Sequence, residues 1–433
     1  MSSTIPPTHN YESQIVFSNQ SNNIKSNDVI NFTIAPSGDD TYFDLYKSRL
    51  SLRIKITGLA AANADTTFYI PVKKNMAGIV NNTKVTYTYW DGNALSTLPL
   101  NADNENIGQI RSLLNTVTDN KHNHVVNEGI KELSYIMYDD YDTDEATTNG
   151  VAFTLQRPSK GSLFFNKLKF TQAKSATIAY STINVNFSDI FEGCSQERFI
   201  RLTQMDAQVF PTNDDAYFYI EGTNIKKLVT ADLTEEDLAF GGVFFDSCTI
   251  WYHNYKTTDE TIFDPEDTQI VKNQIMTKTF NIPSAQGFID DRVLVNFPIK
   301  HMFMLFTDED GDFSELKDVR FKRISLNIAG EQKRILNVNN GNNPDGIDTT
   351  FFEWMDYICN VNSSEYDTLL TYKTWRDQFR ILCFPIAEWF PQKTSNQLQF
   401  EIELDNSVTG APNATAKIQM HLIMIRSDRV PSN

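Results

Sequence analysis

The chain has 433 residues, 40% of them hydrophobic, which suits two domains of roughly 200 residues, each with its own buried core. Its formal net charge is −17, because 55 acidic residues face 38 basic ones. Broad contact with a nucleic-acid backbone or an anionic membrane needs many Lys and Arg residues, so this balance argues against both and leaves only a local basic patch open. The 30 Phe and 17 Tyr favour pleated, half-buried surfaces and therefore β structure.

The four cysteines are widely separated and form no CxxC pair, which argues against a zinc or disulfide framework. We expect free, mostly buried thiols in Cys194, Cys248, Cys359 and Cys383, and a protein made in a reducing compartment inside the cell. The N-terminal sequence MSSTIPPTHNY does not resemble a signal peptide. No apolar stretch approaches the ~20 residues that a membrane-spanning helix needs.

Residues 1–28 are polar and rich in Ser, Asn and Pro, so they are predicted to form a flexible N-terminal arm. From residue 29 onward, short apolar runs alternate with polar residues at period two. In the segment 50–56 (LSLRIKI) one face carries only Leu and Ile, and the other carries Ser, Arg and Lys. This pattern predicts a strand with one face on a core and the other in water. Further strands are expected at 29–34, 67–72, 83–90, 162–170, 177–187, 198–210 and 216–222.

Helical spacing of apolar residues predicts a short inserted helix at 105–117, followed by a long polar loop at 119–162. The acidic segment 230–240 (TADLTEEDLAF) is expected to be a short capped helix or a linker. The second half repeats the pattern, with a polar loop at 337–350 and a helix at 365–379. Its strands are expected at 248–255, 277–282, 292–306, 319–330, 380–386, 397–404 and 416–425.

The chain is therefore predicted to be all-β, with two tandem domains that close as sandwiches or barrels and carry short inserted helices. Two eight-stranded jelly-roll sandwiches in tandem (a double jelly roll) are one such solution, and the family resemblance described below implies it. The predicted domains are a flexible N-terminal arm at 1–28, a first jelly roll at 29–229, a linker at 230–242, a second jelly roll at 243–426 and a C-terminal tail at 427–433.

Motifs for catalysis or cofactor binding are absent from the sequence: it has no GxGxxG, GxxxxGK[ST], GxSxG or HExxH. His122 and His124 could contact a metal, but their polar surroundings favour a solvated loop. The acidic run 307–312 departs from EF-hand spacing, since Gly311 comes too early, and the cluster 139–145 is typical of an exposed acidic loop. We predict no catalytic, cofactor-binding or metal-binding residues.

Three groups of segments carry a family resemblance. The segments 33–58 (TIAPSGDDTYFDLYKSRLSLRIKITG) and 70–95 (IPVKKNMAGIVNNTKVTYTYWDGNAL) are similar to the family's opening strands and hairpin. The segment 183–218, with SDIF at 188–191 and Cys194, is similar to its mid-chain motif. The closing elements follow the family's order at 297–306, 319–335, 369–386 and 413–430. The sequence resembles the double jelly-roll major capsid proteins of the Polinton, adintovirus-like, virophage and Polinton-like virus branch of the adenovirus hexon lineage, with departures at 73–76 (KKNM), Ile79 and 119–162.

This resemblance implies a structural major capsid protein of an icosahedral DNA virus and no enzyme activity. Three copies are expected to form a homotrimer, a pseudo-hexagonal capsomer that contacts neighbouring capsomers, pentons and minor capsid proteins. The resemblance further implies a place in the virion capsid after synthesis in the host cell interior, and no sequence-specific nucleic-acid binding. It leaves an internal membrane open. The long loops 119–162 and 337–350 would face outward, and the terminal arms would hold neighbours near the base.

Other readings of the same composition stay open. A single-jelly-roll penton needs only one sandwich, and a parvovirus-like coat protein would have one sandwich with very long loops. A carbohydrate-binding or glycoside-active β-sandwich protein would use stacked aromatics, and in the second case paired carboxylates, but no two acids of this sequence stand out for that role.

Overall fold

The computed structural model describes most of the strands and several of their connections. The described residues are 10–20, 23–35, 41–74, 76–90, 95–101, 136–137, 166–191, 201–228, 235–256, 274–282, 288–295, 299–308, 321–328, 331–337, 356, 382–386, 396–404 and 418–426. The chain divides into two compact units. The first unit comprises 1–116, 123–272 and 429–433, and the second comprises 117–122 and 273–428.

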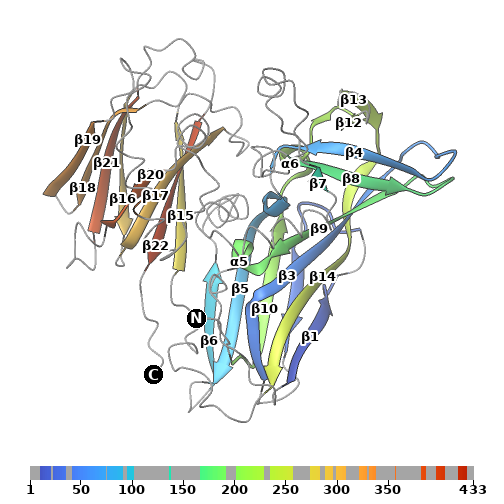
Figure 1. The fold of residues 1–433 in the computed structure, drawn as a ribbon, viewed down its shortest axis with the longest axis horizontal. Helices are drawn as coiled ribbons and strands as arrows, with labels where there is room; N and C mark the ends of the chain where they lie inside the picture. The colour runs from blue at the N-terminus through green and yellow to red at the C-terminus, as the bar shows by residue number, and fades with distance from the viewer. Residues whose placement is uncertain are drawn as a thin grey trace, which may run out of the picture. The chain divides into compact units, whose positions relative to one another are not determined.

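The large sheet of the first unit has ten strands, all paired antiparallel (Figure 1). In order across the sheet, its main path is β1 (Asn10–Phe17), β14 (Gly242–Lys256), β3 (Thr41–Thr57), β9 (Ala179–Asn186), β8 (Asn166–Gln172), β4 (Thr66–Val72), β12 (Asn224–Leu228) and β11 (Ile220–Glu221). Beside this path, β13 (Glu235–Ala239) pairs with β12, and β7 (Ile136–Met137) pairs with β8.

A second sheet of the first unit has four strands, in the order β2 (Ile30–Ile34), β10 (Gln204–Pro211), β5 (Val80–Trp90) and β6 (Leu95–Asn101). The described helices of this unit are short: η1 (Met76–Ile79), α5 (Phe187–Ile190) and α6 (Asp214–Tyr217). Helix α5 follows β9 of the large sheet, and the Thr83 hydroxyl on β5 donates a 2.6 Å hydrogen bond to the Ile190 carbonyl. This bond links the two sheets where α5 ends.

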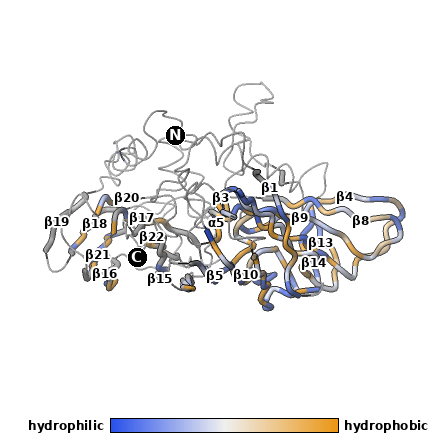
Figure 2. The backbone as a smooth tube through the Cα atoms, turned by 90° about the horizontal axis from the view of Figure 1, so that it is seen from below, coloured by the Kyte–Doolittle hydropathy of each residue, from blue (hydrophilic) through white to orange (hydrophobic). Residues whose placement is uncertain are grey.

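The core of the first unit is one continuous hydrophobic cluster that draws side chains from both sheets. Along β3, every second residue from 50 to 56 is fully buried, as the alternation predicts. Figure 2 shows the corresponding alternation of hydrophobic and hydrophilic residues along strands of this unit. Lys55 is the exception on the other face: it is buried, its ammonium donates a hydrogen bond to Asn23, and it lies 5.9 Å from the Phe244 ring centroid.

The second unit contains two four-stranded antiparallel sheets. One has the order β15 (Gln274–Ile282), β22 (Ile418–Arg426), β17 (Ile299–Asp308), β20 (Leu382–Phe384). The other has the order β16 (Phe288–Val295), β21 (Asn396–Leu404), β18 (Phe321–Ile328), β19 (Glu331–Asn337). Phe280 of β15 and Phe400 of β21 meet edge to face at 5.4 Å, so the two sheets pack against each other as a sandwich.

The predicted fold class is confirmed: the chain is all-β, with two tandem antiparallel sandwiches in a double jelly roll. The described residues of the second unit form eight strands, and those of the first unit add further strands to its large sheet. The predicted helices at 105–117 and 365–379 lie outside the described residues. The same is true of the loops 119–162 and 337–350, apart from β7 and Asn337. Among the described residues, no helix has the length and apolar character that a membrane crossing requires.

The predicted linker at 230–242 is wrong where the structure describes it. Residues 235–239 form β13, which pairs with β12 instead of turning as a helix. Opposite charges face each other across the two strands: Lys226 contacts Asp237 at 2.9 Å, and Lys227 contacts Glu236 at 3.5 Å. A capping pattern in the sequence cannot reveal these partners.

The predicted start of the second domain at residue 243 is also wrong. Residue 243 lies in β14, but this strand belongs to the first unit, where it pairs with β3 along its whole length and buries Val243, Phe245 and Ile250 in the first core. The unit boundary follows residue 272. The predicted N-terminal arm needs the same correction, since residues 10–17 form β1 on the outer side of β14.

Candidate functional site

The outward face of the β1–β14 pair is the most distinctive surface of the described chain. Ile15 faces Trp251 across the pair, and Phe17 faces Thr249. Ile15, Phe17 and Trp251 are 48%, 65% and 49% exposed, so three of the five large hydrophobic side chains exposed on the described residues share this face. Scattered exposed hydrophobics are ordinary, but a contiguous group on one face indicates an interaction surface.

Polar contacts fasten β1 to β14 at the end away from Phe17. The Ser13 hydroxyl and the His253 Nδ1 atom share a 2.9 Å hydrogen bond. The Tyr252 hydroxyl donates to Gln14 at 2.5 Å on the opposite face. Glu12 and Lys256 form an exposed ion pair at 3.6 Å, which contributes little to stability in water. Strand β1 is thus held by its hydrogen-bond ladder, a few polar contacts and the packing of one apolar side chain, Val16, against the first core.

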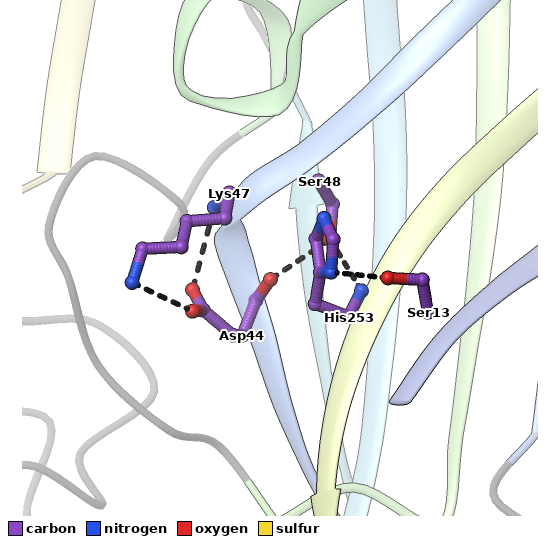
Figure 3. Close-up of polar contacts among 5 residues, drawn as sticks. All are labelled: Ser13, Asp44, Lys47, Ser48 and His253. Carbon is purple, nitrogen blue, oxygen red and sulfur yellow. Dashed lines mark hydrogen bonds and ion pairs between the residues drawn. The ribbon is translucent and has the colours of Figure 1, made fainter. Parts of the chain in front are cut away.

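Strand β3 carries a wide bulge beside this pair. Arg49 pairs with Trp251 of β14, and the next residue of β3 that pairs with β14 is Asp44, which lies opposite His253. Residues 45–48 of β3 lie between these two pairs and form the bulge. Inside the bulge the Ser48 hydroxyl donates to the Asp44 carbonyl at 2.8 Å, and the Asp44 carboxylate accepts from the Lys47 amide at 3.3 Å (Figure 3). Asp44 also forms an ion pair with the Lys47 ammonium at 3.6 Å. The bulge is therefore a single turn, held closed by the contacts of Asp44 with Lys47 and Ser48.

His253 stands between the bulge and β1. Its backbone amide donates to the Ser48 hydroxyl at 3.3 Å, and its ring contacts Ser13 (Figure 3). Burial lowers the pKa of His253, and the positive charges of Arg49 and Lys47 lower it further. The neutral imidazole is therefore the form that this environment favours.

Ser13, His253 and Asp44 contain the residue types of a hydrolytic triad, but their geometry differs from one. In a triad the serine bonds to Nε2 of the histidine, and the carboxylate orients the ring through Nδ1. Here Ser13 occupies the Nδ1 side, and the Asp44 carboxylate contacts Lys47. The arrangement fastens strands together, and it gives Ser13 no activated hydroxyl.

The other candidate residues from the sequence form no functional site in the described part of the chain. His122, His124, the cluster 139–145 and residues 309–312 lie outside the described residues. Within the described ranges, no group of three or more His, Cys, Asp or Glu could hold a metal ion. Cys248 and Cys383 are free and buried, as predicted, whereas Cys194 and Cys359 are not described. Burial and the nearby Asp246 raise the pKa of Cys248 to about 12, so its thiol is unreactive at neutral pH.

Sequence reasoning missed the β1–β14 surface because the first 28 residues were assigned to a flexible arm. A signal was present: in NYESQIVF, Tyr11, Ser13, Ile15 and Phe17 alternate with Glu12, Gln14 and Val16. This short alternation is typical of a strand. What the pattern lacks is any sign of the partner strand, which is some 240 residues away in the sequence.

Known proteins were compared with the chain in sequence and in structure. No protein-family model matches it, and no curated protein is similar to it in sequence. In structure it is similar to a chain of the Sputnik virophage, with a TM-score of 0.55 and 14% identity over 96% of this chain and 85% of that one. The mavirus major capsid protein (TM-score 0.47, 10% identity, 98% of this chain and 88% of that one) and the Faustovirus major capsid protein (0.47, 9%, 98% and 91%) also match. At 14% identity the Sputnik match establishes the shared fold.

Proposed function

We propose that this chain is the major capsid protein of an icosahedral DNA virus, a structural shell subunit without enzyme activity. The observation that carries this proposal is the tandem arrangement of two antiparallel sandwiches in one polypeptide, in a fold shared with a chain of the Sputnik virophage over 96% of the sequence.

The mechanism of such a subunit is geometric. A trimer of a two-sandwich chain presents six sandwiches around one axis, which gives a building block with nearly hexagonal outline and only three-fold true symmetry. Blocks of this outline tile a closed shell through contacts with neighbouring capsomers, and pentons close the vertices. Minor capsid proteins are the other partners that we assign, and the virion is the location.

The chemistry of the chain supports a passive role. A shell subunit needs rigid sandwiches and large contact surfaces, and it needs no activated nucleophile. The pairing of Ser13 with Nδ1 of His253 and the raised pKa of Cys248 both leave potential nucleophiles unactivated. The net charge of −17 disfavours genome condensation by this chain, which would fall to a separate basic protein.

Light scattering during size-exclusion chromatography tests this proposal. We expect a particle with three times the 49.4 kDa mass of one chain, and electron microscopy of that fraction should show a particle with a three-fold axis and six lobes. A chain that stays monomeric across the accessible concentration range contradicts the proposal. So does cleavage of glycosidic bonds in a panel of polysaccharides by the purified protein.

A further inference from the structure

One row of side chains crosses three strands on the outward face of the large sheet. Ile15 of β1 is paired with Trp251 of β14, and Trp251 is paired with Arg49 of β3. Directly paired residues point to the same face with Cβ atoms about 5 Å apart, so these side chains are immediate neighbours. The row places an arginine beside two half-exposed apolar side chains.

Arg49 differs from the second arginine of the same face. Arg53, four residues further along β3, has its guanidinium 3.9 Å from the centroid of the Tyr180 ring and 3.8 Å from the carboxylate of Asp246. Arg49 has neither kind of contact among the described residues, and its Nε atom is buried without a hydrogen-bond partner. A buried guanidinium donor without an acceptor is costly, and that cost is removed when the half-buried Arg49 side chain turns toward an acceptor on an incoming molecule.

We propose that the face formed by Ile15, Trp251 and Arg49 binds a second copy of this chain, and that Arg49 donates hydrogen bonds to a carboxylate of that neighbour. The inference rests on the proposed function and deepens it by assigning one of the subunit contact surfaces. The second copy is the occupant because charges match: a chain with 55 acidic residues and a net charge of −17 offers carboxylates over its surface, and this face offers an uncompensated cation.

The composition of the face suits a protein partner better than a nucleic acid. An aromatic residue and an arginine within an apolar patch are the residue types that dominate protein–protein contacts. A polyanion would need several cations in a row, whereas the row beside Arg49 continues with the apolar Trp251 and Ile15. One carboxylate flanked by apolar side chains is the ligand that fits.

Two variants test the proposal: Arg49→Gln, which removes the charge, and Trp251→Ser, which removes the largest apolar side chain of the row. Each is expected to weaken self-association about tenfold or more in a dilution series followed by sedimentation velocity. The matched control pair lies on β16 of the second unit, where Arg292→Gln and Leu294→Ser change an exposed arginine and an apolar side chain that is 65% exposed. These controls are expected to associate like the unchanged chain.

Misfolding is separated from a lost contact by the thermal stability of the dissociated chain. Arg49→Gln removes an unpaired buried donor, so its monomer should unfold at the same temperature as the unchanged monomer or higher. Weak association together with an undiminished unfolding temperature supports the proposal. Weak association that follows a lowered unfolding temperature in both Arg49→Gln and Trp251→Ser overturns it.

Oxidative footprinting identifies what covers the face. Trp251 should be oxidised readily in the dissociated chain and protected in the oligomer. Equal protection in both states would mean that another part of the same chain covers Trp251, and equal oxidation would mean that nothing does; either result overturns the inference. If the trimer forms and its stability is unchanged by Arg49→Gln and Trp251→Ser, the inference is overturned but the proposed function stands. If the unchanged chain never associates, the proposed function itself is wrong.

Discussion

Strand β14 has two neighbours, β3 and β1, and they are held in different ways. On β3, Leu50, Leu52, Ile54 and Ile56 are completely buried in the first core. On β1, the apolar residues Ile15 and Phe17 point outward and are about half exposed or more. Both strands pair antiparallel with β14, β1 in a continuous register and β3 with two interruptions. Membership in a sheet therefore says little about how firmly a strand is attached, because burial supplies most of the stabilisation.

This contrast divides the large sheet into a firmly packed interior and a lightly attached edge. Local opening of a structure is governed by the apolar area that opening exposes, so β1 should open at a much lower free energy than β3. An edge strand that opens easily and carries exposed Ile15 and Phe17 is suited to exchange its contacts during assembly. Substitutions at Leu52, Gly58, Gly222 and His253 test how far the contrast extends.

The largest effect is expected from Leu52→Ala on β3. Leu52 is fully buried, so the substitution leaves a cavity between the sheets and should lower the free energy of unfolding of the first unit by about 3 kcal/mol. Urea denaturation followed by fluorescence measures the shift. Ile15→Ala on β1 is the matched control and should change the free energy by less than about 0.5 kcal/mol. Equal losses of unfolding free energy in Leu52→Ala and Ile15→Ala would show that β1 is attached as firmly as β3.

A smaller loss is expected where β3 leads into its turn. Gly58 has φ of +71°, and a Cβ atom placed there would lie 2.6 Å from the backbone nitrogen of Gly241, just before β14. Gly58→Ala should therefore cost about 2–3 kcal/mol, from the left-handed backbone and from this collision.

Gly222 separates these two causes of strain. It has φ of +62°, but a Cβ atom there would meet nothing within 4 Å. Gly222→Ala should cost only about 1 kcal/mol in the same denaturation assay, since the backbone conformation alone is unfavourable. A cost at Gly58 no greater than that at Gly222 would show that β3 and β14 can separate at this end without penalty.

The smallest effect is a pH dependence confined to the β1 edge. The folded pKa of His253 lies below its ordinary value of 6.5, so the folded state binds its proton less readily than the unfolded state does. The resulting stabilisation is present above about pH 6.5 and is lost as the pH falls below it toward the folded pKa. Hydrogen exchange of the β1 amides, corrected for intrinsic rates, should show protection falling a few-fold in this range while the β3 amides change little.

His253→Asn keeps a polar side chain opposite Ser13 and removes the titrating group. In this variant the protection of β1 should no longer depend on pH between about 5.5 and 7.5. A persistent dependence would assign the effect to a group other than His253.

Much of the fold was predictable because the alternation that marks a strand lies within a few consecutive residues. The alternation in 50–56 predicted both the strand and its buried face, and the segments at 83–90, 177–187 and 397–404 likewise became β5, β9 and β21. The two units were predictable as sandwiches, but their boundary was not. The boundary was missed because β14 follows the acidic segment that resembles a linker, although it pairs with β3 in the large sheet of the first unit.

The candidate surface shows the same limit at the level of single residues. The sequence displays Ile15, Trp251 and Arg49 as unrelated positions, two of them in segments read as an arm and as a second-domain strand. Only their registers bring them into one row. The sequence also does not reveal that Arg49 lacks a partner among the described residues. Arg53 occupies an equivalent outward position on the same strand, yet its guanidinium contacts Tyr180 and Asp246.

By itself, the sequence determined the all-β class, the alternating faces of the strands and the absence of the familiar catalytic motifs, since each of these follows from residues within one strand's length of each other. The tertiary structure decided which strands pair, where the first unit ends and which apolar side chains remain outside. Those outcomes depend on contacts between residues about 200 or more apart in the chain, such as Arg49 with Trp251 and Ser13 with His253, and local propensity carries no information about them.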